Sequence, residues 1–112
     1  MHATGVSMHQ SELKSRILDG LATDQHYLQV KESLQQGDVQ QKIKEYEIKE
    51  DGLLMHKNRI YVPSSEDLRN LVLKEMHDVP YVGHFGYQKT ITVVRSQFFW
   101  SGMKKDVFYY IA

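Results

Sequence analysis

Residues 43–63 read IKEYEIKEDGLLMHKNRIYVP, and this stretch decides the fold class. Polar and apolar side chains alternate over residues 45–49, which is the period of a half-buried strand. Asp51-Gly52 follows and predicts a hairpin with a type I′ turn, whose two central residues both need positive φ. The chain thus changes here from helical spacing to strand alternation.

The same stretch contains the signals for two further strands. Residues 53–56 read as the return strand of the hairpin, and Lys57-Asn58 makes a second tight turn. Residues 59–62 form a third strand, which Pro63 closes because proline cannot donate to a ladder. The sequence predicts a three-stranded antiparallel meander.

Helical patterns lie before the meander. Residues 1–10 show little pattern, and then Leu13, Ile17 and Leu18 recur at helical spacing. Thr23-Asp24 can cap a second helix that Gly37 ends. We expect a helical extension over residues 1–40.

Three more helices are expected after the meander, over residues 66–77, over residues 87–97 and from Met103 onward. Their inward-facing positions and the aromatic run between them predict a core made of Leu68, Leu71, Val72, Ile91, Val94, Phe99, Trp100 and Val107. The fold class is α+β, with helices at 1–40, the meander at 41–63 and a small bundle of three helices at 64–112.

Two histidines flank a loop between helical patterns. Residues 77–86 read HDVPYVGHFG, so His77 ends one helix and His84 lies just before the next. Such a loop can bring two imidazoles to one ion, and they would fill half of a tetrahedral zinc site. The alternative is that both are ordinary surface or core histidines, which is how the other four, His2, His9, His26 and His56, are interpreted.

Four basic residues are candidates for phosphate contacts, namely Lys89, Arg95, Lys104 and Lys105. The alternative is an ordinary solvated surface. The 112 residues have a formal net charge of zero and no cysteine, so neither a strongly basic module nor a disulfide framework is indicated. No long apolar run or secretory signal is present, and we expect a soluble intracellular chain. No grouping typical of an active site occurs.

The run from Tyr46 to Ala112 resembles the N-terminal zinc-binding region of integrases from gypsy-type LTR retrotransposons, relatives of retroviral integrases. The pieces that carry the resemblance are residues 50–54 (EDGLL), 59–63 (RIYVP), 73–78 (LKEMHD), Gly83-His84, Gly86, Lys89-Thr90, Phe99-Trp100 and 102–107 (GMKKDV). Phe85 and Ser101 depart from it, because the family usually has proline at both positions.

The resemblance implies that the bundle at 64–112 is helix-turn-helix-like and has a metal site with defined ligands. The family pattern is His-His followed by Cys-x-x-Cys, and His77 and His84 fall on the histidine positions. The cysteine pair would then lie just beyond Ala112, completing a structural Zn²⁺ site, so the chain looks truncated. Residues 1–40 would join the RNase H region of a polyprotein to integrase.

The resemblance also implies a function. It predicts a non-catalytic part of integrase that contacts element-end DNA and other integrase protomers during DNA integration, with no membrane and no small-molecule substrate. The location would be nuclear, with a cytoplasmic stage in particles. The alternative is a metal-free protein-interaction module from a domesticated or decayed element. Salt-dependent DNA binding would distinguish the two.

Overall fold

The computed structural model describes residues 4–38, 40–77 and 86–111, with both helices and strands. In chain order the elements are α1 (Thr4–Leu21), α2 (Gln25–Gln35), α3 (Gln41–Lys44), β1 (Tyr46–Ile48), β2 (Leu54–His56), β3 (Arg59–Tyr61), α4 (Glu66–His77), α5 (Tyr87–Gln97), β4 (Phe98–Phe99) and α6 (Met103–Ile111). This arrangement confirms the predicted α+β class.

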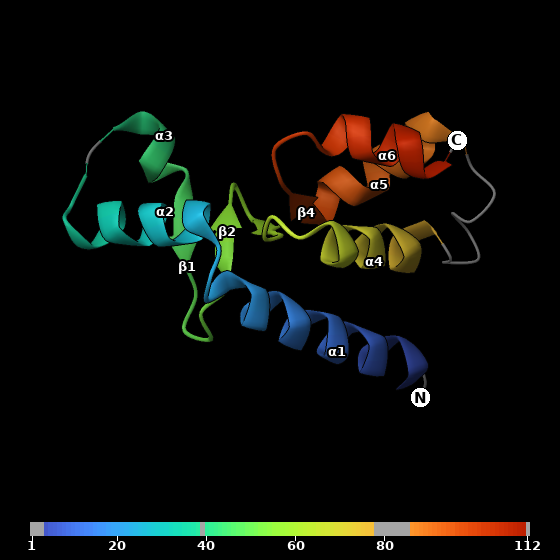
Figure 1. Ribbon diagram of the computed structural model, residues 1–112, viewed down its shortest axis with the longest axis horizontal. Helices are drawn as coiled ribbons and strands as arrows, with labels where there is room; N and C mark the ends of the chain where they lie inside the picture. The colour runs from blue at the N-terminus through green and yellow to red at the C-terminus, as the bar shows by residue number, and fades with distance from the viewer. Residues whose placement is uncertain (1–3, 39, 78–85, 112) are drawn as a thin grey trace.

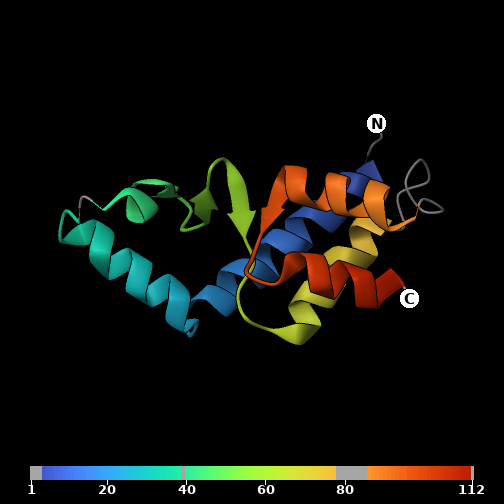
Figure 2. The same cartoon turned by 90° about the horizontal axis from the view of Figure 1, so that it is seen from above.

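The molecule is elongated, with principal extents of 44 × 31 × 21 Å. Helices α2 and α3 lie at one end and α4, α5 and α6 at the other, with the sheet between them (Figure 1). Seen from above, α1 runs from the sheet toward the α4–α6 end (Figure 2). It begins at Thr4, within a stretch that the sequence left unpatterned. Once a helix is nucleated, each added residue gains a hydrogen bond, so it can extend past its apolar stripe.

The sheet has four strands in the order β1-β2-β3-β4, which is the predicted three-stranded meander with one strand added. The meander β1–β3 is antiparallel as expected. The additional strand β4 pairs parallel to β3, with Ile60 opposite Phe98 and Tyr61 opposite Phe99. The Val62 N–H donates to the Phe99 carbonyl at 3.1 Å. A two-residue strand is too short to show alternation, and only its parallel partner reveals it.

The type I′ turn of the meander lies at the second turn and not at the first, where the sequence predicted it. Lys57 and Asn58 both have positive φ, 50° and 67°, as a type I′ turn requires. At the first turn only Gly52 is left-handed, with φ 101°, and its N–H donates to the Lys49 carbonyl. This is a longer loop closed by a left-handed glycine, not the predicted type I′ turn. The Asp51 carboxylate favours it by accepting from the Leu53 N–H at 3.0 Å.

Polar side chains and one glycine set the ends of the helices. Asp24 caps α2, and the Ser65 hydroxyl accepts from the Leu68 N–H at the start of α4. Gly37, with φ 74°, follows the end of α2 as predicted. Ile43 lies within the range 41–63 that was predicted as the meander, but it is buried in the one-turn helix α3.

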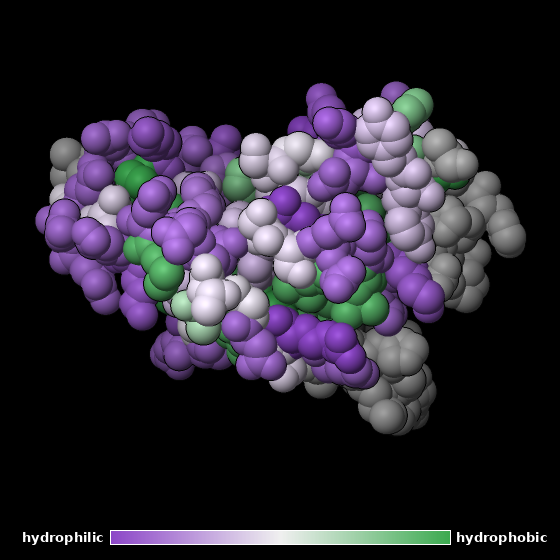
Figure 3. Space-filling view, in the orientation of Figure 1, coloured by the Kyte–Doolittle hydropathy of each residue, from purple (hydrophilic) through white to green (hydrophobic). Residues whose placement is uncertain are grey.

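One hydrophobic cluster extends through the described chain. It includes Leu13 and Ile17 from α1, Leu54 from the sheet, and Val72 and Val107 from the last three helices. Helix α1 packs on α4, and the face in Figure 3 shows an apolar strip between them on an otherwise largely hydrophilic surface. The division into 1–40, 41–63 and 64–112 stays a prediction, although residues from α1, the sheet and α4–α6 share this core.

Within the described ranges, no helix is both long and apolar enough to span a bilayer.

Candidate functional site

One of the two predicted zinc ligands lies at an end of a described range, and the other lies outside the described residues. His77 is the last residue of α4, and α5 begins at Tyr87. His84 falls in the segment 78–85, outside the described residues. Among residues 4–38, 40–77 and 86–111, no three histidine or acidic side chains are grouped as a metal site requires. The sequence has no cysteine, so its two loop histidines provide at most half of a tetrahedral ligand set.

The four predicted phosphate-binding residues lie on two helices that pack together, α5 and α6. Lys89 and Arg95 are on α5, Lys104 and Lys105 on α6, and all four are exposed. Asp106 is the single acidic residue of the range 86–111, so these four cations give that range a net charge of +3. Since the whole chain is neutral, the rest of it has a net charge of −3. Positive charge is therefore concentrated on the range that contains α5 and α6.

The Asp106 carboxylate is already engaged inside the protein. It accepts a hydrogen bond from the Trp100 indole N–H at 2.8 Å, and Trp100 is 2% exposed. The Arg69 guanidinium lies over the same indole, 5.5 Å from the ring centroid, and donates to the Val62 carbonyl at 3.1 Å. These contacts fix the start of α6 against α4, while Lys104 and Lys105 of α6 stay exposed.

Two exposed aromatic residues of α6 were not among the predicted site residues. Phe108 is 56% exposed and Tyr109 is 65% exposed. The Phe108 ring lies edge-on to Tyr87 of α5, with centroids 6.2 Å apart, and edge-on to Tyr109 at 5.6 Å. Helical spacing contains the signal, because Met103 and Val107 face the core and so residues 104, 105, 108 and 109 must face outward.

Six of the eight predicted core residues are buried, namely Leu68, Val72, Ile91, Val94, Trp100 and Val107. Leu71 and Phe99 are partly buried and pack against the same cluster. Phe99 lies at the sheet because it belongs to β4, and its ring stacks on His56 with centroids 4.0 Å apart.

Residues 64–112, the range that covers α4, α5, β4 and α6, match the family model described as integrase zinc binding domain. The match covers 49 of the 112 residues, and we name this range the zinc-binding domain after it. The family is a non-catalytic N-terminal domain of integrases. No curated protein and no solved structure matches the chain.

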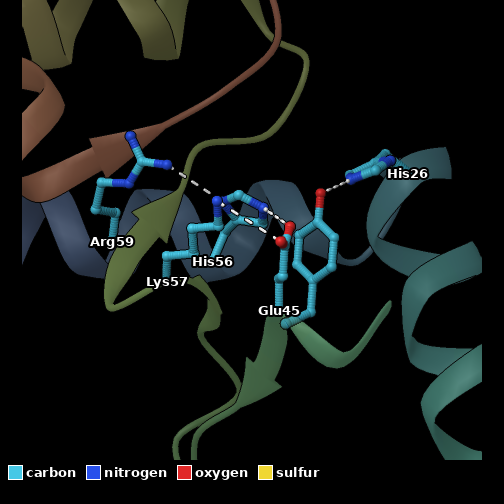
Figure 4. A network of polar contacts seen from close by, with 6 residues as sticks. His26, Glu45, His56, Lys57 and Arg59 are labelled. Atoms are coloured by element: carbon cyan, nitrogen blue, oxygen red, sulfur yellow. Dashed lines mark hydrogen bonds and ion pairs between the residues drawn. The ribbon is translucent and has the colours of Figure 1, made fainter. Parts of the chain in front are cut away.

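A polar junction within the segment before residue 64 consists of His26, Glu45, Tyr46, His56 and Arg59. Figure 4 labels four of these side chains, and Phe99 of the zinc-binding domain stacks on His56. The His56 Nε2 lies 3.2 Å from a Glu45 carboxylate oxygen, and its Nδ1 lies 3.3 Å from an Arg59 guanidinium nitrogen. The Tyr46 hydroxyl lies 2.9 Å from the His26 Nε2. The imidazole of His56 thus joins β2 to α3 and β3, while its face lies on Phe99 of the zinc-binding domain.

Burial determines the titration of the central imidazole. His56 is 8% exposed, and burial lowers its pKa because water no longer solvates the imidazolium. The hydrogen bond that the Glu45 carboxylate accepts from His56 opposes this shift, while the charges of Arg59 and Lys57 reinforce it, so the pKa of His56 is lowered overall. Neutral His56 is the favoured form in the folded chain.

Asp24 makes a second connection to the zinc-binding domain. Its carboxylate accepts from the Tyr27 N–H at 2.9 Å, the Tyr61 hydroxyl at 2.8 Å and the Ser64 N–H at 2.7 Å. Burial raises the pKa of Asp24, but these three hydrogen bonds outweigh burial and the net pKa is lowered. Burial and the neighbouring carboxylate raise the pKa of Tyr61. One ionised side chain therefore holds α2, β3 and the segment entering α4.

Proposed function

We propose that this chain is the non-catalytic N-terminal part of an integrase from a gypsy-type LTR retrotransposon. In this role it binds a structural zinc, contacts the element-end DNA and contacts other integrase protomers during DNA integration. Integration acts on chromosomal DNA, so the proposed location is the nucleus, with a cytoplasmic stage in particles. The observation that supports DNA contact is the exposed net charge of +3 on residues 86–111 of a neutral chain.

Helices α5 and α6 each contribute two of the four exposed cations. Phosphate contacts by lysine and arginine position a protein on DNA without reading its sequence. A protein that neutralises four phosphates releases their counterions, so its affinity falls with a log–log salt slope of about −3.6. Between 50 and 200 mM salt the affinity would then decrease by about 10²-fold. That steep dependence is what separates this function from the metal-free interaction module.

The test is a salt titration of duplex DNA binding with two matched double variants. Lys104→Ala/Lys105→Ala should weaken binding and reduce the slope by about two. Lys42→Ala/Lys44→Ala removes the same charge from exposed positions of α3 and should leave the slope unchanged. Equal slopes for both variants, or no duplex binding at low salt, would contradict DNA contact and favour the protein-interaction module.

For zinc, we propose that His77 and His84 are two ligands and that cysteines beyond Ala112 supply the other two. Metal affinity in such small domains is coupled to folding, because the site does not exist in the unfolded chain. Residues 1–112 should therefore bind zinc only weakly, with two coordination positions left to water. A tight one-to-one zinc isotherm on residues 1–112 would disprove this ligand set. His77→Ala should abolish the weak binding, while His26→Ala serves as the control.

A further inference from the structure

The exposed side of α6 combines two lysines with two aromatic rings. Lys104 and Phe108 are four residues apart, as are Lys105 and Tyr109, so each lysine is a neighbour of one ring along the helix surface. The opposite side of α6 is formed by Met103 and Val107, which are 6% and 0% exposed. The helix is thus held by its apolar side and presents a lysine–aromatic surface, defined here as Lys104, Lys105, Phe108 and Tyr109.

Two large aromatic residues exposed side by side indicate an interaction surface, because water solvates their faces poorly. Apart from these two, Leu28 is the other exposed large hydrophobic residue in the described part of the chain. Phe108 is held edge-on to Tyr87, so its position is defined by α5 as well as α6. The planes of Phe108 and Tyr109 are 79° apart, so one flat group cannot stack on both rings.

From these features we propose that the lysine–aromatic surface binds unpaired nucleotides, such as a single-stranded extension at a DNA end. Phe108 and Tyr109 would each stack on a different base, while Lys104 and Lys105 contact the flanking phosphates. The inference rests on the proposed DNA contact and adds to it the kind of DNA bound. Bases in a duplex stack on one another, so exposed rings reach base faces only where the strand is unpaired.

Charge favours a nucleic acid over the alternative of a second copy of this chain. A symmetric contact through this surface would bring Lys104 and Lys105 of one copy against the same lysines of the other, which like charges oppose. A polyanion carrying flat apolar groups matches both features of the surface. Stacking also tolerates any base, so the surface needs no sequence-reading groups.

A cleft next to Tyr109 fits the same ligand. It has a volume of about 700 Å³ and lies between the start of α4 and α6. Its lining includes Ser64, Ser65 and Asn70, which offer hydrogen bonds, together with the carboxyl groups of Glu66 and Asp106. With Arg69 as its one cation, the cleft suits the polar edge of a neutral base better than a phosphate.

The test compares three mixed-sequence probes by fluorescence anisotropy with the full 112-residue chain: a blunt duplex, the same duplex with a short single-stranded extension, and the single strand. We expect the extension to increase the affinity by about tenfold or more, since stacking contributes that much per base. Phe108→Leu/Tyr109→Leu should abolish this preference while leaving blunt-duplex binding unchanged. Tyr109→Phe, which keeps a ring, should retain the preference, and Leu28→Ala is the control for an exposed apolar residue.

Each result has a distinct meaning. Blunt-duplex binding without any preference for the extension, or an unchanged preference in the leucine variant, would overturn this inference but not the proposed DNA contact. Absence of binding to all three probes would overturn both. If the leucine variant instead changes the sedimentation coefficient of the chain alone, the rings contact protein and the inference is wrong. Near-ultraviolet signals from buried Trp100 would verify that each variant is folded.

Discussion

Two regions of the molecule use similar residues in opposite ways. The first is the contact between the N-terminal segment and the zinc-binding domain, and the second is the exposed side of α6. At the contact, charged and aromatic groups such as Asp24, His56 and Phe99 meet partners inside the protein. On α6, the lysines and aromatic rings of the lysine–aromatic surface point to solvent. Internal pairing makes the first set a determinant of stability, and exposure makes the second set available for binding. The comparison predicts that substitutions in the two regions affect different measurements.

The largest effect is expected where α1 joins the core. Ile17 is 1% exposed and belongs to the same cluster as Val72 of α4. Ile17→Ala should lower the free energy of unfolding by about 2–5 kcal/mol, through lost burial and the cavity left behind. Trp100 is the single tryptophan and lies in the zinc-binding domain, so its fluorescence reports that domain during urea unfolding.

This variant tests whether the N-terminal segment is part of the folding unit. A shared core predicts that the Trp100 transition moves with the circular-dichroism transition, and by the same amount. A Trp100 transition that stays in place while helicity is lost at lower urea would show that α1 unfolds separately. Leu28→Ala, at a position 41% exposed, is the control and should change stability little.

A somewhat smaller loss is expected from the Asp24 side chain. Asp24→Ala removes the cap of α2 and leaves the buried Tyr61 hydroxyl and the Ser64 N–H without their acceptor. A lost cap costs about 1 kcal/mol and an unsatisfied buried group about 1–3 kcal/mol, so a decrease of about 2–4 kcal/mol is expected. Asp24→Asn keeps one oxygen and should lose less. Asp19→Ala, on the exposed side of α1, should be near neutral by the same urea measurement.

The sequence predicted the elements that are long or bounded by strong turn signals. The alternation before Asp51 and the helical stripe that includes Val72 were sufficient for the meander and α4, because burial repeats with the period of the element. Strand β4 and helix α3 were missed, since two and four residues cannot display a period. The contact of Phe99 with His56 also depends on strand pairing between distant segments, which no local pattern encodes.

The candidate site was also predicted only in part from the sequence. The family resemblance identified the domain through its ordered motifs, and the family match at 64–112 confirms it. Whether His77 and His84 bind zinc stays a prediction. The exposure of Phe108 and Tyr109 was not predicted, although the helical spacing around Val107 contains the signal for it. The packing of α5 against α6 shows that Tyr87 lies beside Phe108.

The polar junction predicts that stability depends on pH. The expected change in the free energy of unfolding is smaller than the change caused by Asp24→Ala. Because the folded pKa of His56 is lowered, the folded chain binds fewer protons than the unfolded chain below the ordinary histidine pKa of about 6.5. Stability from this group is therefore complete above that pH and is lost as the pH falls through the folded pKa. His56→Gln should flatten this part of the stability–pH curve. An identical slope in wild type and His56→Gln would refute the prediction.

The smallest change in stability is expected on the lysine–aromatic surface, and it tests the other half of the comparison. Lys104→Ala/Lys105→Ala removes two exposed charges from the start of α6. Cations there oppose the helix dipole, so their removal should raise the free energy of unfolding slightly, by less than about 0.5 kcal/mol. The same variant should weaken DNA binding strongly. A loss of stability comparable with Asp24→Ala would mean that these lysines hold the fold, and the weakened binding could then no longer be attributed to lost phosphate contacts.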